Sequence, residues 1–94
     1  MAELLKPEAV QVLLQEVPAW KLFDNSIERT LTFKGFAEAV EFIVRLAKEA
    51  EEMNHHPDID VRWNKVRLVL STHSAGGLTD QDFSLARRID KLAG

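Results

Sequence analysis

The sequence of 94 residues contains no cysteine, and this absence removes several kinds of chemistry. Without thiols the chain forms neither disulfide bonds nor thiolate zinc sites, and it has no cysteine nucleophile. It also lacks an apolar run near the roughly 20 residues that a membrane-spanning helix needs. No basic and apolar leader precedes its first residues. We therefore expect a cytoplasmic protein that does not insert into a membrane.

Positive charge and chain-breaking residues are also scarce. The formal net charge is −3, which disfavours direct binding to nucleic acid, because nucleic-acid binders normally present a basic face. Only four glycines and three prolines occur, and 46% of the residues are hydrophobic, as is typical of a globular chain. A chain of this length has room for one hydrophobic core, so we expect a single domain over residues 1–94. Such a small core also favours self-association.

Hydrophobic periodicity predicts three helices and two hairpins. The helices cover about residues 6–17, 35–56 and 78–94, and the hairpins lie at about 20–33 and 59–73. The predicted order is therefore α-β-β-α-β-β-α. This order indicates an α+β fold in which a four-stranded antiparallel sheet carries the three helices on one face.

The second hairpin allows a prediction of strand register. If Asn64 and Lys65 form a two-residue turn, the apolar side chains share one face in the pairs Trp63–Val66, Val61–Leu68 and Ile59–Leu70. Continuing this count past Pro57 places His56 opposite His73. The register therefore predicts that histidines far apart in the sequence come together.

The longest predicted helix carries more apolar surface than one core contact requires. One row at steps of three and four contains Phe36, Val40, Ile43, Ala47, Ala50 and Met53, and the row is widened by Phe42, Val44 and Leu46. A broad core contact is the ordinary interpretation. Contact with a second subunit is the sharper alternative.

The three histidines of the chain, His55, His56 and His73, are candidates for proton transfer or metal binding. Glu51 lies one helical turn before His55 and can orient its imidazole. An exposed, weak Glu–His pair and solvated surface histidines are the simpler alternative. Three imidazoles and a carboxylate can also bind zinc or non-haem iron, but no HExxH spacing is present, so we favour acid–base chemistry without a metal.

Three further residues have both a structural and a functional interpretation. Asp82 follows Thr79 at the spacing of a capping box, whatever else it does. Trp20 and Trp63 are most simply core or half-buried aromatics, although a tryptophan beside a polar cleft can hold a flat ring. The serines and threonine around His73 form no nucleophile-elbow motif, which disfavours a hydrolase.

The spacing of these residues resembles the signature of the pterin-4a-carbinolamine dehydratases. The signature consists of Glu51, the run His55-His56-Pro57, Trp63, His73 and Asp82, with gaps of three, five, nine and eight residues. The segments TFKGFAEAVEFI, NKVRLVLSTH and GGLTDQD are also similar to segments of this family. The resemblance covers nearly the whole chain after the first predicted helix.

The resemblance implies the dehydration of 4a-hydroxytetrahydropterin to quinonoid dihydropterin, in tetrahydrobiopterin recycling and without a metal or redox cofactor. It implies that all three histidines serve the reaction, with His55 and His73 as acid and base in either order and His56 on the pterin ring. Glu51 would orient His55, and Asp82 would shape the pocket. The remaining candidates for substrate binding are Trp20 and Trp63.

The resemblance also implies partners other than the pterin. Members of the family form homo-oligomers, so we expect a homodimer or homotetramer. In animals, members also serve as dimerisation cofactors of a homeodomain transcription factor. That alternative function would use an exposed helix face that includes Phe42 and Val44, and it would not need the histidines.

Overall fold

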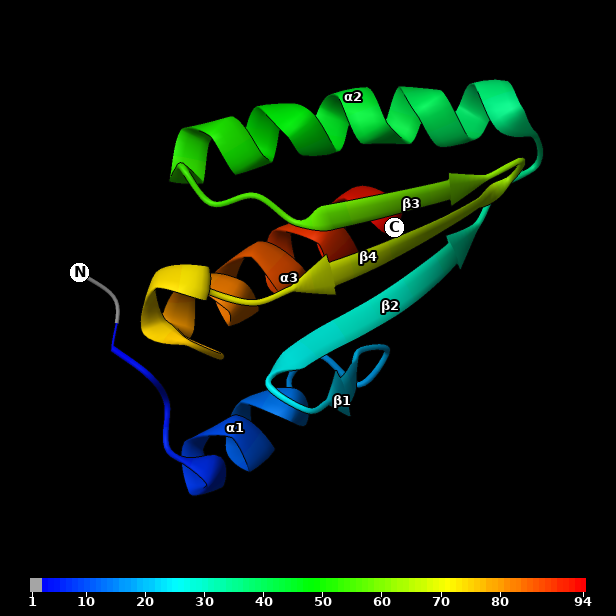
Figure 1. Ribbon diagram of the computed structural model, residues 1–94. Helices are drawn as coiled ribbons and strands as arrows, with labels where there is room; N and C mark the ends of the chain where they lie inside the picture. The colour runs from blue at the N-terminus through cyan, green and yellow to red at the C-terminus, as the bar shows by residue number, and fades with distance from the viewer. Residues whose placement is uncertain (1–2) are drawn as a thin grey trace.

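The computed structural model describes residues 3–94, which form three α-helices and a four-stranded antiparallel sheet (Figure 1). The elements follow in the order α1 (Pro7–Leu14), β1 (Lys21–Phe23), β2 (Ser26–Thr32), α2 (Phe36–Met53), β3 (Asp58–Arg62), β4 (Lys65–Leu70), the 3₁₀ turn η1 (His73–Ala75) and α3 (Asp80–Ala93). The predicted α+β class and the predicted element order are confirmed. Within the described residues, no helix is both long enough and apolar enough to span a membrane.

The helix ends follow local sequence signals. Pro7 stands in the first turn of α1, where its missing N–H costs no hydrogen bond. Thr79 and Asp82 form the predicted capping box of α3. The Asp82 side chain accepts the backbone N–H of Thr79, and the Thr79 side chain accepts the backbone N–H of Gln81. Asn54 ends α2 in the left-handed conformation, at φ 50° and ψ 43°. Asparagine tolerates this conformation better than most residues.

The strands lie in the order β1-β2-β4-β3, so β1 and β3 are the edges of the sheet (Figure 1). Alternate side chains of the two central strands are buried, namely Ile27 and Leu31 on β2 and Val66, Leu68 and Leu70 on β4. They pack into one core cluster with buried side chains of all three helices. The other face is polar, and an ion pair of 2.6 Å between Arg67 and Glu28 lies across it. This alternation is the expected pattern for an antiparallel sheet covered on one face.

The predicted register of the second hairpin is wrong by two residues. Val61 pairs with Val66, and Ile59 pairs with Leu68, so the turn consists of Trp63 and Asn64. A shift of two residues keeps every side chain on its predicted face. The observed register also places Asp60 opposite Arg67, an attractive pair, whereas the predicted register would place Arg62 opposite Arg67.

Contacts outside the hairpin explain this register. The Asn64 side chain donates to the Phe33 carbonyl oxygen at 2.9 Å, and the Phe33 N–H donates to the Asn64 carbonyl oxygen at 2.8 Å. These reciprocal bonds hold the turn against the end of β2, and Trp63 takes a positive φ of 54°. Extending the observed register no longer brings His56 opposite His73.

The core-facing side of α2 also differs from the predicted row. The buried residues are Ala39, Phe42, Leu46 and Ala50, and the helix packs against α3 and β4. Phe42 is fully buried, and its ring centroid lies 5.1 Å from that of Phe33. Of the predicted row, Ala50 is buried and Ile43 and Met53 pack against the core. Phe36 and Val40 are exposed, as is the flanking Val44, by 65%.

Candidate active site

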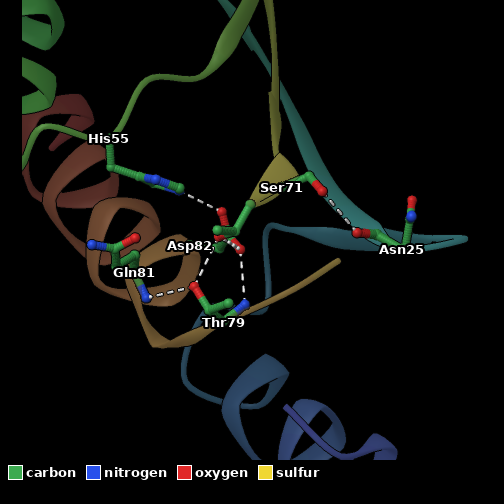
Figure 2. Close-up of polar contacts among 7 residues, drawn as sticks. Asn25, His55, Ser71, Thr79, Gln81 and Asp82 are labelled. Atoms are coloured by element: carbon green, nitrogen blue, oxygen red, sulfur yellow. Dashed lines mark hydrogen bonds and ion pairs between the residues drawn. The ribbon is translucent and has the colours of Figure 1, made fainter. Parts of the chain in front are cut away.

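Asp82 is the centre of a buried polar cluster at the start of α3 (Figure 2). Its side chain is fully buried. One oxygen, Oδ2, accepts the backbone N–H of Thr79 at 2.9 Å, which is the capping-box bond, and it also accepts the hydroxyl of Thr72 at 2.9 Å. The second oxygen, Oδ1, lies 2.6 Å from Nε2 of His55. A carboxylate that is buried away from water needs several hydrogen-bond partners, and the fold supplies three.

His55 reaches this carboxylate because the chain leaves the helix just before it. The left-handed Asn54 ends α2, and the His55 N–H donates to the Ala50 carbonyl oxygen at 3.0 Å. The side chain is thereby directed away from the surface of α2 and toward α3, and the residue is only 8% exposed (Figure 2).

The predicted pairing of Glu51 with His55 is therefore wrong. One-turn spacing applies only while the chain remains helical, and the helix ends at Met53. Glu51 instead contacts His56, with 2.5 Å between Oε2 and Nε2. Both side chains of that pair are exposed. The two adjacent histidines thus occupy different surroundings, one buried on a carboxylate and one at the surface.

His73 lies next to the same cluster through its neighbour Thr72. The loop that follows β4 closes on itself, because the Thr72 N–H donates to the Gly77 carbonyl oxygen at 2.8 Å and Gly76 adopts a φ of 78° that favours glycine. His73 begins this loop and is exposed. Beside it lies a hollow of about 470 Å³ whose lining also includes Asp58 and Ser71.

The loop that carries His73 is also held from the side of β1 and β2. The Ser71 hydroxyl donates to the Asn25 carbonyl oxygen at 3.2 Å (Figure 2). The Asn25 side chain donates to the Gly76 carbonyl oxygen, also at 3.2 Å. Sequence reasoning missed Asn25, and it considered Thr72 only as part of a possible hydrolase site, because neither residue belongs to a recognised catalytic pattern. Their only sequence signal is position, next to a turn and next to His73.

The two tryptophans do not join this cluster within one chain. Trp20 is buried in the core, and its indole N–H donates to Asp90 on α3 at 2.8 Å. Trp63 lies in the hairpin turn, at the opposite end of β3 from the histidines, and is 69% exposed. Of the predicted site residues, the structure gathers His55 and Asp82 directly, His73 through Thr72, and Glu51 with His56 at the adjoining surface.

The arrangement has the properties of a proton-transfer site. An ionised carboxylate accepts hydrogen bonds only, so the short contact with Asp82 assigns a proton to Nε2 of His55. This bond fixes the orientation of the ring and leaves Nδ1 as the nitrogen that can exchange a proton. Among residues 3–94, no group of three or more histidine, cysteine or acidic side chains is arranged to hold a metal ion.

Comparison with known proteins agrees with the resemblance. A family model described as pterin 4 alpha carbinolamine dehydratase matches residues 3–92. A provisionally named pterin-4-alpha-carbinolamine dehydratase of Acidobacterium capsulatum is 50% identical over 88 residues, which cover 94% of this chain and 96% of the relative. A relative of the same provisional name in Chloroflexus aurantiacus is 47% identical over 94 residues, the full length of both chains.

Two solved structures share the fold. A transcriptional coactivator/pterin dehydratase from Brucella melitensis has a TM-score of 0.92 and 33% identity, covering 96% of this chain and 98% of that one. A pterin dehydratase-like protein described as a RuBisCO assembly factor in the alpha-carboxysome has a TM-score of 0.65 and 25% identity, covering 80% of this chain and 87% of that one. With the match over residues 3–92, these findings show that the chain belongs to the pterin-4-alpha-carbinolamine dehydratase family.

Proposed function

We propose that this protein dehydrates 4a-hydroxytetrahydropterin to quinonoid dihydropterin in tetrahydrobiopterin recycling. The observation that supports the proposal is the buried contact between His55 and Asp82, which is joined through Thr72 to the loop that carries His73. An imidazole held on a buried carboxylate is suited to proton transfer near neutral pH. The structural role of Asp82 as a helix cap does not by itself require a histidine.

The reaction needs two proton transfers and no change of redox state. The 4a-hydroxyl takes up a proton and leaves as water. The N5–H bond breaks, its proton passes to a base, and its electrons form the C4a=N5 double bond of the quinonoid product. His55 and His73 are the acid and the base, and each such transfer commonly accelerates a reaction by about 10²–10⁴-fold.

Of the other predicted site residues, His56 binds the substrate. His56 is at the surface beside the cluster and holds the pterin ring, and Glu51 orients His56 through their 2.5 Å contact. Asp82 orients the His55 ring through its contact with Nε2. Trp20 and Trp63 lie away from this cluster in a single chain, so the proposed reaction does not use them.

The decisive experiment is a dehydratase assay on chemically generated 4a-hydroxytetrahydropterin. We expect dehydration well above the spontaneous rate, with a double variant of His55→Ala and His73→Ala as the protein control. We also expect the activity to persist in the presence of a chelator, because neither proton transfer requires a Lewis acid. A wild-type rate equal to the spontaneous rate contradicts the proposal, and so does activity that a chelator abolishes and zinc restores.

We also propose that the chain forms a homodimer or homotetramer through α2. Phe36, Val40 and Val44 lie at steps of four residues along α2, and all three are exposed. A row of large apolar side chains on a surface helix is typical of a protein interface. The alternative function, a dimerisation cofactor for a transcription factor, would use the same row. It cannot use Phe42, which is buried in the core.

A further inference from the structure

The hydrogen bonds that link Thr79, Thr72 and Asp82 all have their donors directed toward the Asp82 carboxylate. The Thr72 hydroxyl carries one proton, and it donates that proton to Oδ2 of Asp82 at 2.9 Å. The contact of 2.8 Å between the Thr72 and Thr79 hydroxyls therefore has Thr79 as its donor. The Thr79 oxygen in turn accepts the backbone N–H of Gln81 at 3.3 Å (Figure 2). Every donor in this chain of bonds points toward the Asp82 carboxylate.

Such a chain acts on His55 through the carboxylate. Hydrogen bonds in series polarise one another, and the effect is strongest where water is excluded. Thr72, Thr79 and Asp82 are all buried. Donors on Oδ2 draw negative charge away from Oδ1, and Oδ1 is the oxygen that faces His55. The Thr72 hydroxyl therefore affects the charge on the oxygen that bonds the His55 ring, and with it the strength and orientation of that bond.

The backbone of Thr72 acts on the other histidine. Its N–H donates to the Gly77 carbonyl oxygen, and its carbonyl oxygen accepts the N–H groups of Ala75, Gly76 and Gly77 at 3.0, 3.0 and 3.3 Å. These bonds close the loop in which His73 directly follows Thr72. A single residue thus anchors the His73 loop by its backbone and the His55–Asp82 pair by its side chain.

We infer that Thr72 is a positioning residue of the dehydratase site. Its hydroxyl orients Asp82 and His55, and its backbone holds the His73 loop in place beside them. This inference rests on the proposed function for its kinetic consequences. Thr72 does not touch the reacting atoms. Its role goes beyond capping, because Thr79 and Asp82 form the capping box of α3 and Thr72 lies outside that helix.

The test compares Thr72→Val with Thr72→Ser. Valine keeps the β-branched shape and the backbone bonds of the loop but removes the hydroxyl, whereas serine keeps the hydroxyl. We expect Thr72→Val to lower kcat about tenfold with little change in KM, and Thr72→Ser to stay within about threefold of wild type. A purely structural role for Thr72 would not produce a loss that is confined to kcat and restored by the serine variant.

A double-mutant cycle with Asp82→Asn shows whether Thr72 acts through the carboxylate. We expect Thr72→Val to have little further effect on kcat in the Asp82→Asn protein. Equal impairment of the valine and serine variants overturns the inference, as does a full tenfold loss in the Asp82→Asn background.

Nitrogen-15 NMR of the imidazoles gives a readout that does not depend on activity, and its wild-type part does not depend on the folding of a variant. In the wild-type protein, neutral His55 should carry its proton on Nε2, and in Thr72→Val the Nε2–H resonance should move. A proton on Nδ1 of neutral wild-type His55 overturns the inference. An inactive wild-type protein with the expected NMR spectra would contradict the proposed dehydratase function but would leave the link between Thr72, Asp82 and His55 standing.

Discussion

His55 and His73 differ in how the protein holds them, although the proposed reaction uses both. His55 is buried against a carboxylate that belongs to another helix, 27 residues further along the chain. His73 is exposed on a short closed loop. The buried His55 should contribute to stability as well as to catalysis, whereas the exposed His73 should contribute to catalysis alone. Single substitutions at the two positions should therefore have different effects on the free energy of unfolding.

Replacing His55 by alanine should affect both turnover and stability. Turnover should fall tenfold or more. The free energy of unfolding should fall by about 1–3 kcal/mol, because the buried Asp82 loses one of its three hydrogen-bond partners. Dehydratase kinetics and urea unfolding measure the two effects. An unchanged rate in this variant would contradict the acid–base role of His55.

Replacing His73 by alanine should affect turnover alone. The side chain is exposed, so the unfolding midpoint in urea should stay close to that of wild type, while kcat falls tenfold or more. The double variant with His55→Ala should lose most remaining catalysis without simple additivity, since both groups serve one reaction. A His73→Ala protein with wild-type kcat would remove His73 from the mechanism.

Replacing His56 by alanine should weaken substrate binding more than it slows the chemical step. His56 and Glu51 form an exposed pair, and such pairs contribute little to stability. We therefore expect a raised KM, a smaller change in kcat and an unchanged unfolding midpoint. The matched variant Glu51→Gln should change KM in the same direction, because Glu51 orients His56. A loss confined to kcat would instead assign His56 to the proton transfers.

At the scale of elements, the end of α2 determines where the histidines lie. The segment 54–57, which begins with the left-handed Asn54, reverses the chain direction between α2 and β3, a strand at the edge of the sheet (Figure 1). The left-handed conformation costs most residues about 1–2 kcal/mol. Glycine has no such cost, and asparagine has less than alanine.

The substitution Asn54→Ala should therefore lower the free energy of unfolding by about 1 kcal/mol. Asn54→Gly should match wild type in stability, and it is the control for loss of the asparagine side chain. Urea unfolding with a common m-value measures both changes. The alanine variant should also lose activity, because the strained turn carries His55. Equal stability of the alanine and glycine variants would show that the left-handed turn is not a source of strain.

At the scale of the whole molecule, the exposed row Phe36, Val40 and Val44 on α2 is the surface proposed to contact a second subunit. Val44→Asp should shift the protein to a smaller species, because a charge in an apolar interface is costly. Val12→Asp on α1 is the matched control, since Val12 is a similarly exposed valine, and it should leave the mass unchanged. Light scattering at micromolar concentration measures both. A wild-type protein that is only monomeric, or a Val12 variant that dissociates as readily, contradicts the proposed interface.

Several features could be predicted because they depend on neighbours in the sequence. The alternation of β2 and β4 follows from the period of a strand, and the cap of α3 follows from the spacing of Thr79 and Asp82. The order of the elements follows from the same local periods. The spacing of the signature residues also identified the candidate side chains of the site, because spacing can be read directly from the sequence.

The remaining features depend on contacts between distant segments. The apolar residues of α2 would permit either face to pack, and the neighbouring α3, β4 and Phe33 select the face that contains Phe42. Either hairpin register would bury the same face of β4, and the reciprocal bonds of Asn64 with Phe33 select one of them. His55 is paired with Asp82 and not with Glu51 because Asn54 breaks the helical spacing and α3 brings a buried carboxylate within reach. Local periodicity specifies which residues can face a core, whereas the partner of each side chain is determined only when the helices and the sheet pack together.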